Sequence, residues 1–184
     1  MPSPRLAALL LGIVATIVVP SPIAVGLDAR YAEAEAYEQT LIDCTRSGGW
    51  VREDGTCDAE DVDGRVPARP PLTVSAKVSD ELARPYARLL ARAGYLSHYL
   101  GGSIDQRFAR IGMADGRAGE NLGHTGGLTV GVNAAVLHIH LMFQEEWSYG
   151  GWHFRNLTDG RFTQVGIGVW VKGNRTYLVL DFHS

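Results

Sequence analysis

The sequence lacks the short motifs that mark the common classes of hydrolase and nucleotide-binding protein. It contains no GxSxG, no P-loop and no HExxH. The glycines at positions 166 and 168 lie in a predicted strand without the rest of a dinucleotide-binding pattern. No serine or cysteine nucleophile is evident, so the sequence gives no support to nucleophilic hydrolysis.

A large excess of charge is also lacking. The 184 residues carry 17 Lys and Arg against 20 Asp and Glu, for a formal net charge of -3. Nucleic-acid-binding domains carry a basic patch or stripe, so we expect no nucleic-acid partner. A hydrophobic fraction of 46% and a charged fraction of 20% fit one globular domain with a sizeable core.

The long apolar run at the N-terminus, residues 6–19, is too short to span a membrane comfortably. Two prolines follow at positions 20 and 22, and residues 24–26 have the small-x-small pattern of a signal-peptidase site. We therefore predict a secretory signal at residues 1–26 and one domain at 27–184, secreted and without a stable transmembrane span. The alternative is an uncleaved membrane anchor.

Cysteine is scarce, with only Cys44 and Cys57 in the chain. An even number of cysteines in an exported protein indicates one disulfide. The intervening residues 45–56 include three glycines and are able to turn back. Two free thiols are the alternative. A zinc site here is disfavoured because no histidine lies nearby.

Helical patterns come first along the chain. Apolar spacing and helix-forming residues predict helices at 29–46, 82–93, 104–111 and 134–147, the last capped by Asn133. Since Pro85 is awkward inside a helix, regular geometry is expected only from Arg84. The polar, proline-ended stretch 47–71 is interpreted as a variable loop that carries the disulfide.

Strand patterns come last. Residues 165–171 alternate, residues 172–174 form a turn, and residues 177–182 return as the second strand of a hairpin. The glycine-rich stretch 119–127 is predicted to be a loop or a strand edge. Helices followed by strands, with one helix between them, indicate an α+β fold. The tryptophans at 147, 152 and 170 are expected to pack in the core, and His183 is expected to be exposed.

Three short sequences in this half of the chain occur in a familiar order. They are GENL at residues 119–122, HFRNL at 153–157 and FTQVGIGV at 162–169, and Ser97-His98 precedes them. The arrangement resembles the CAP superfamily (the SCP domain), most of all its bacterial branch, over residues 33–184. The resemblance implies a three-layer α-β-α sandwich around a central antiparallel sheet.

In that family two histidines and two acids converge on a central cleft. Carried over to this chain, the resemblance implies a cleft tetrad of His98, Glu120, Glu146 and His153. A tetrad of this kind suits zinc or another divalent cation, with His98 and His153 as the main ligands. The alternative is a hydrogen-bonded polar network that only orders the cleft.

Other candidates for this region are Glu145, His124 and His138. Glu145 is the alternative second acid, and His124 lies in a glycine-rich stretch that we expect to be able to approach the cleft. His138 and Glu145 are about two helical turns apart, which allows an additional metal site. His138 and His140 cannot share a helix face, so one of them is expected in the core or cleft. Asn156 is expected to make a structural hydrogen bond in a turn.

Two functions fit these residues. We favour an extracellular binding or interaction module for a small molecule, a lipid or a cell-surface component, because no nucleophile is evident. A metal-assisted hydrolase that uses the same tetrad, with Glu120 or Glu146 as the general base, is the alternative. A lipid role requires an apolar groove beside the cleft, whereas a metalloenzyme requires an open coordination position.

Overall fold

The computed structural model describes residues 25–59, 64, 66–126 and 131–184. The predicted signal at 1–26 lies outside these residues, except for its last two. In the described part of the chain, no helix is both long and apolar enough to cross a membrane.

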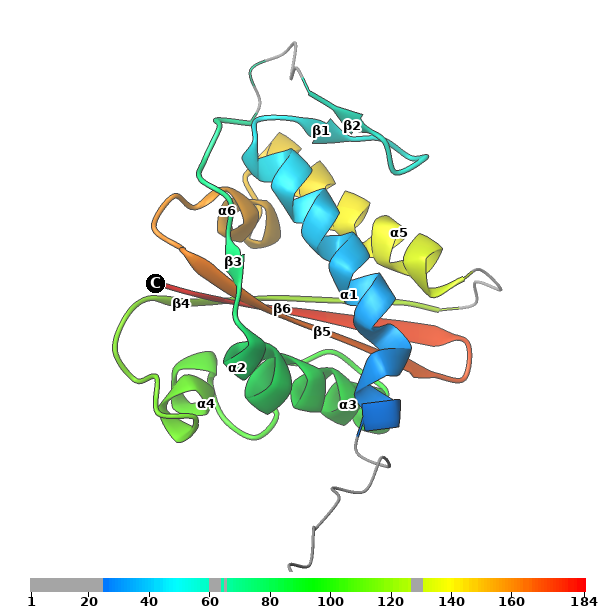
Figure 1. Ribbon diagram of the computed structural model, residues 1–184, viewed down its shortest axis with the longest axis vertical. Coiled ribbons are helices and arrows are strands. Elements are labelled where there is room, and N and C mark those ends of the chain that lie inside the picture. The colour runs from blue at the N-terminus through cyan, green and yellow to red at the C-terminus, as the bar shows by residue number, and fades with distance from the viewer. Residues whose placement is uncertain (1–24, 60–63, 65, 127–130) are drawn as a thin grey trace, which may run out of the picture.

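A four-stranded sheet with the strand order β3-β5-β6-β4 runs through the middle of the molecule (Figure 1). The strands are β3 (Thr73–Val74), β4 (Ala118–Thr125), β5 (Gln164–Lys172) and β6 (Arg175–His183). The predicted hairpin is confirmed as β5 and β6, and β4 pairs with β6, both antiparallel. The short β3 pairs parallel to β5, which the expectation of an antiparallel sheet did not include.

Helices cover both faces of the sheet, as Figure 1 shows. One face carries α1 (Val25–Arg46), α5 (Val132–Glu145) and α6 (Trp152–Thr158). The other carries α2 (Ala76–Val78), the π-helical η1 (Ser79–Ala83), α3 (Arg84–Ala93) and α4 (Ile104–Arg110). This arrangement confirms the expected α+β fold with three layers.

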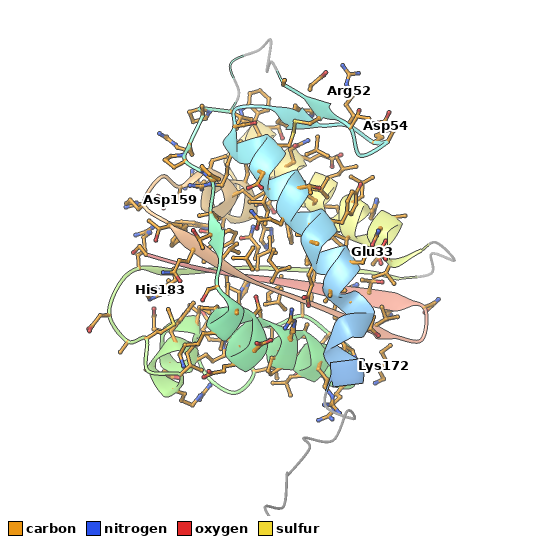
Figure 2. All side chains as sticks on the ribbon, viewed as in Figure 1. Glu33, Arg52, Asp54, Asp159, Lys172 and His183 are labelled. Carbon is orange, nitrogen blue, oxygen red and sulfur yellow. A yellow bond between two sulfur atoms is a disulfide. The ribbon has the colours of Figure 1, made fainter. Side chains whose placement is uncertain are left out.

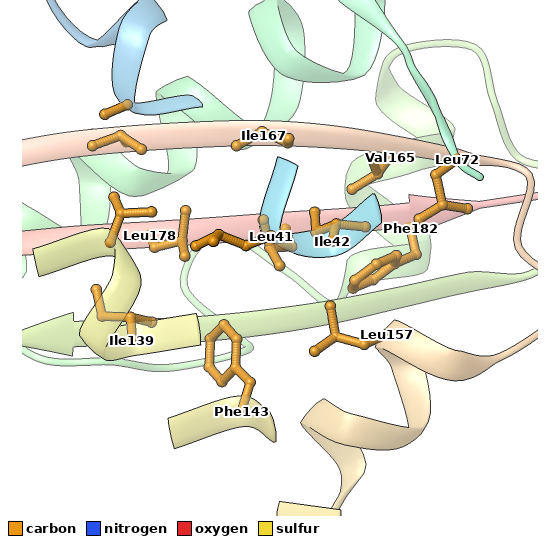
Figure 3. Close-up of a cluster of buried hydrophobic side chains, with 14 of the residues drawn as sticks. Leu41, Ile42, Leu72, Ile139, Phe143, Leu157, Val165, Ile167, Leu178 and Phe182 are labelled. Carbon is orange, nitrogen blue, oxygen red and sulfur yellow. The ribbon is translucent and has the colours of Figure 1, made fainter. Parts of the chain in front are cut away.

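The strands bury side chains on both faces, and the two faces have separate cores. Leu178, Leu180 and Phe182 of β6 pack under α1, α5 and α6, with Ile139 among their neighbours (Figure 3). The intervening Tyr177 and Val179 pack against α3. Period-two alternation therefore distributes apolar residues to both sides of β6 instead of leaving one side to solvent.

The helical segment α2–η1–α3 lies directly on the sheet because β5 carries two glycines there. A methyl group at Gly166 would lie 2.4 Å from Val78, and one at Gly168 would lie 2.3 Å from the backbone of Ala83. The π-helical turn η1 ends immediately before α3, which carries Pro85 in its first turn. Proline lacks an N–H and clashes with an earlier carbonyl, so the preceding turn widens.

The predicted disulfide between Cys44 and Cys57 is present. The expectation that residues 47–71 form only a loop was wrong, because β1 (Trp50–Val51) and β2 (Cys57–Asp58) pair as a small antiparallel ladder. The side-chain amide of Gln144 bonds both the N–H and the carbonyl of Val51, at 2.9 Å each. The disulfide and this amide fix the ladder to α1 and α5.

Two further sequence expectations were wrong in detail. The cap of α5 is Gly131, whereas Asn133 lies inside the first turn and donates to Glu33 Oε1 at 3.4 Å. His183 is buried at the end of β6, at the opposite end of the hairpin from Lys172 (Figure 2), because its ring packs 4.8 Å from that of Phe108.

Candidate functional site

A pocket of about 490 Å³ opens beside β4. Its lining comes from the segment after α3, from α4, from β4 and from α6. The lining residues are His98, Tyr99, Ser103, Ile104, Asp105, Glu120, Trp152, His153 and Asn156. Figure 1 shows α4 and α6 on opposite sides of β4. The structure therefore brings His98, Glu120 and His153 of the expected tetrad to one cavity.

Glu120 is the fixed acid of this pocket. Its side chain is only 2% exposed, and one carboxylate oxygen lies 2.6 Å from Nδ1 of His98. The other oxygen accepts a hydrogen bond from Nη2 of Arg107. Arg107 is buried, and its guanidinium carbon lies 3.5 Å above the ring centroid of Tyr86. The buried ion pair with Arg107 holds Glu120 in place. Of the three residues Arg107, Glu120 and His98, only His98 is substantially exposed to solvent.

Local structure positions both partners of Glu120. Ser103 and Gln106 form a capping box at the start of α4, which places Arg107 on the buried side of that helix. His98, the other partner of Glu120, is positioned from α3. The Tyr86 hydroxyl of that helix donates to the Ser97 carbonyl at 2.5 Å and ties the segment that carries His98 to α3.

A second buried acid lies next to Glu120, because Asp181 of β6 is its cross-strand partner. Asp181 is fully buried, and neither carboxyl oxygen has a hydrogen-bond partner among the described residues. Burial raises the pKa of Asp181 well above its ordinary value, the nearby Glu120 charge adds to this, and Arg107 opposes it. Asp181 therefore retains its proton at a pH where an exposed aspartic acid is ionised.

His153 and Glu146 form the other pair at the pocket. Nδ1 of His153 lies 2.6 Å from Oε1 of Glu146, and the His153 backbone N–H donates to Oε2 at 2.9 Å. Glu146 thus caps the start of α6 and fixes the imidazole with the same carboxylate. Glu146 itself is not part of the pocket wall.

Two asparagines connect α6 to β4. The Asn121 side chain donates to the His153 carbonyl at 2.9 Å, and Asn156 donates to Asn121 Oδ1 at 2.9 Å. Asn156 therefore bridges two elements and does not form the expected turn. At the far end of α6 the buried Arg46 donates to the carbonyls of Leu157 and Asp159. The wall that carries His153 is held at both ends.

The remaining sequence candidates lie elsewhere. Glu145 and His138 are exposed and line a separate pocket of about 420 Å³ with Glu53. His124 is on β4, with its ring 5.6 Å from that of Tyr177, and it is not in the wall of the His98 pocket. No cluster of three or more His, Cys, Asp or Glu suited to a metal ion occurs among the residues that the structure describes.

His140 is the core histidine that the spacing required. It is fully buried between α1 and α5, with Nδ1 2.9 Å from Glu38 Oε1 and Nε2 3.1 Å from Thr45 Oγ1. Burial raises the pKa of Glu38, and the contact with His140 opposes this. Thr45, His140 and Glu38 resemble the nucleophile, base and acid of a catalytic triad in their order of contact. All three residues are fully buried, so no substrate reaches them.

The sequence analysis missed Arg107 and Asp181. Asp181 had a signal: it is an acid inside LVLDF, a run that packs apolar side chains on both faces of the sheet. Arg107 had none, because its helix is short and rich in charged residues. The core expectation for tryptophan was wrong for Trp152, which is 72% exposed, and for Trp147, which is 42% exposed.

A second, more apolar pocket lies between α3 and α4. It measures about 190 Å³, and Arg107 contributes to its wall as well as bonding Glu120. Its apolar lining comes from Leu82, Pro85, Tyr86, Leu89, Leu100 and Ile111. Arg107 therefore lines the apolar pocket and, through its guanidinium group, also bonds the acid that lines the polar cleft.

Neither the family models nor the curated proteins include a match to this chain. Among solved structures, it is similar to an outer surface protein from Borrelia burgdorferi, with a TM-score of 0.59 and 15% identity, over 84% of this chain and 94% of that one.

Two further solved structures are similar in the same way. NaASP2, solved with Zn2+, has a TM-score of 0.54 and 14% identity over 82% of this chain and 79% of its own. Na-ASP-1 has a TM-score of 0.55 and 12% identity. The match covers 86% of this chain and 42% of Na-ASP-1. At these identities the likeness shows the fold alone, and that fold is the three-layer α+β arrangement expected from the sequence.

Proposed function

We propose that this protein is an exported binding module whose cleft takes a divalent cation such as zinc through His98 and His153. One observation carries the proposal. Both imidazoles face one pocket, and each has its Nδ1 2.6 Å from a carboxylate oxygen. Carboxylate contacts of this kind orient a histidine and fix its tautomer, which leaves Nε2 as the metal ligand.

The donor set fits an open site. Two imidazoles would hold the cation, Glu120 and Glu146 would orient them, and water or a ligand would complete the shell. The structure of NaASP2, which has a similar fold, was solved with Zn2+. Such a site is suited to capturing a ligand group on the cation.

Zinc titration by calorimetry tests this role. We expect wild type to bind zinc and the double variant His98→Ala/His153→Ala to lose at least about tenfold in affinity. His138→Ala, an exposed histidine outside the cleft, is the matched control and should bind as wild type does. Binding should weaken as the pH falls, since a protonated imidazole cannot ligate. Equal affinity in wild type and the double variant would contradict the proposal.

Export is the second part of the proposal. The short apolar run and the small-x-small pattern support a cleaved signal, and the similar protein from Borrelia burgdorferi is an outer surface protein. N-terminal sequencing of the exported protein should give a start near Leu27. An intact Met1 on a membrane-bound product would support the anchor instead.

Lipid binding is a second candidate because an apolar pocket adjoins the cleft, as the sequence analysis required. Its volume of about 190 Å³ suits the end of an acyl chain more than a whole lipid. Leu89→Trp would fill its mouth, since Leu89 is 39% exposed. We expect this variant to bind a fluorescent fatty acid at least about tenfold more weakly than wild type. Unchanged binding would remove the pocket from any lipid role.

A further inference from the structure

Two of the three most exposed large aromatic side chains in the described part of the chain lie on the walls of the cleft. Tyr99 is 77% exposed and Trp152 is 72% exposed, and both line the pocket that contains His98 and His153. Exposed aromatic rings cost solvation free energy, and they usually mark a contact surface. A metal ion alone would use the imidazoles and leave these two rings without a function.

The residues that carry the two rings are tied to their neighbours. The Arg155 guanidinium lies 5.2 Å from the Trp152 ring centroid and fixes one side of the ring. Trp152 is also the first residue of α6, whose start is capped by Glu146. The Tyr99 backbone N–H donates to the Ser97 hydroxyl at 3.1 Å. Both rings are therefore presented from anchored backbone and not from a free loop.

The floor between the rings is polar. Carboxylate, imidazole, hydroxyl and amide groups come from Glu120, His98, His153, Ser103 and Asn156. Glu120 is held by its buried ion pair and contacts His98 through its other oxygen, so the imidazole on this floor is held in place before a ligand binds. The lining includes two acids, Glu120 and Asp105, and no Lys or Arg among the described residues.

From this combination we infer that the cleft binds a neutral pyranose segment of a polysaccharide, with sugar rings stacked on Tyr99 and Trp152. The C–H faces of a sugar ring pack on the negative face of an aromatic ring, and its hydroxyls bond to carboxylates and imidazoles. Asp105, in a lining that contains no Lys or Arg among the described residues, disfavours uronic-acid sugars by like-charge repulsion. A membrane surface fits less well, because inserting these rings would bury the exposed Asp105 and the half-exposed His98 in the lipid.

The inference rests on the proposed role of the cleft as a binding site, but it does not need the metal. The test is calorimetry with three soluble probes: cellohexaose, a chitin tetrasaccharide and hexagalacturonate. Each is titrated once in EDTA and once with zinc. We expect the two neutral probes to bind in both buffers and the anionic probe to bind at least about tenfold more weakly.

Matched variants locate the contact. Trp152→Ala and Tyr99→Ala should each weaken binding of the neutral probes by about two- to tenfold, the range for one lost aromatic contact. Tyr149→Ala is the control, because Tyr149 is also 72% exposed but lies outside the pocket wall. Zinc affinity should be unchanged in all three variants.

The outcomes separate the two proposals. Zinc binding without binding of any neutral probe overturns the sugar inference and leaves the metal proposal standing. Sugar binding in EDTA by a protein that has no zinc affinity overturns the metal proposal and leaves the sugar inference standing. An equal loss of sugar binding in Tyr149→Ala and Trp152→Ala would overturn the assignment of the rings. Equal affinity for all three probes would overturn the inferred preference for a neutral sugar.

Discussion

The molecule contains the same pair of side chains, histidine with glutamate, in two different environments. His140 and Glu38 are both fully buried between α1 and α5. The His98 side chain is 49% exposed while its partner Glu120 is 2% exposed, and His153 is 27% exposed against 16% for Glu146. The contact distances differ little, at 2.9 Å for the enclosed pair and 2.6 Å for each open pair.

The difference teaches that accessibility, not the contact, separates structural from ligand-binding histidines. Thr45 occupies the second nitrogen of His140, so that ring has no atom left for a ligand. Each open pair keeps its carboxylate on Nδ1 and turns its other side toward the pocket. The enclosed pair should therefore matter for stability and the open pairs for binding.

The strongest way to break this comparison is His140→Ala. It leaves Glu38 and Thr45 buried without their shared partner and creates a cavity, so we expect a loss of roughly 3 kcal/mol or more in the free energy of unfolding. Zinc affinity should not change. His138→Ala, two residues away on the exposed face of α5, should lie within about 0.5 kcal/mol of wild type. Urea unfolding measures the stability of both variants. A loss for His140→Ala as small as that for His138→Ala would show that His140 is not structural.

A second variant separates the buried from the open half of the Glu120 cluster. Glu120→Gln removes the charge opposite the buried Arg107, so we expect a loss of about 2 kcal/mol in the free energy of unfolding. His98→Ala removes only the exposed partner and should cost less than about 1 kcal/mol. Chemical denaturation of both variants is the measurement. A larger loss for His98→Ala would place the stabilising contact on the open side.

The smallest expected effect concerns Asp181 and depends on pH. Its pKa is raised in the folded state, so the folded protein keeps a proton that the unfolded chain releases above about pH 4. Stability therefore falls as the pH rises through this range. Asp181→Asn should unfold like wild type at about pH 3 and be more stable at about pH 8.

Replacing the exposed Asp115 with asparagine is the control and should show no such gain. Denaturation curves at the two pH values decide the matter. A variant less stable than wild type at the higher pH would mean that Asp181 is ionised in the folded protein and stabilised by Arg107.

Sequence patterns predicted the parts of this fold that depend on local periodicity. The β5–β6 hairpin, the helices α1 and α4 and the change to regular geometry at Arg84 all follow from apolar spacing, turn residues or proline chemistry. The parallel pairing of β3 was beyond such patterns, because two residues carry no periodicity. The cap of α5 was missed because Gly131, which precedes the helix without a side-chain oxygen, takes the place expected for Asn133.

The candidate site divides in the same way. The family boxes indicated His98, Glu120 and His153, and the structure places these three on one pocket. Arg107 and Asp181 depend on which side of α4 and β6 faces the sheet, and only tertiary packing decides this. Trp152 was misassigned to the core, since a tryptophan in sequence does not reveal whether its helix faces inward.

The two glycines of β5 have a consequence for a cleft that they do not touch. Gly166 and Gly168 let the backbone of η1 and α3 rest against the sheet, with no room for a methyl group. The segment after α3 carries His98, and Glu120 belongs to the sheet itself. A single added carbon at position 168 would displace the whole helix and widen the gap between the two. Cleft width is thus set by the thickness of the layer beneath α3, and a change there would alter binding without changing any residue in the pocket.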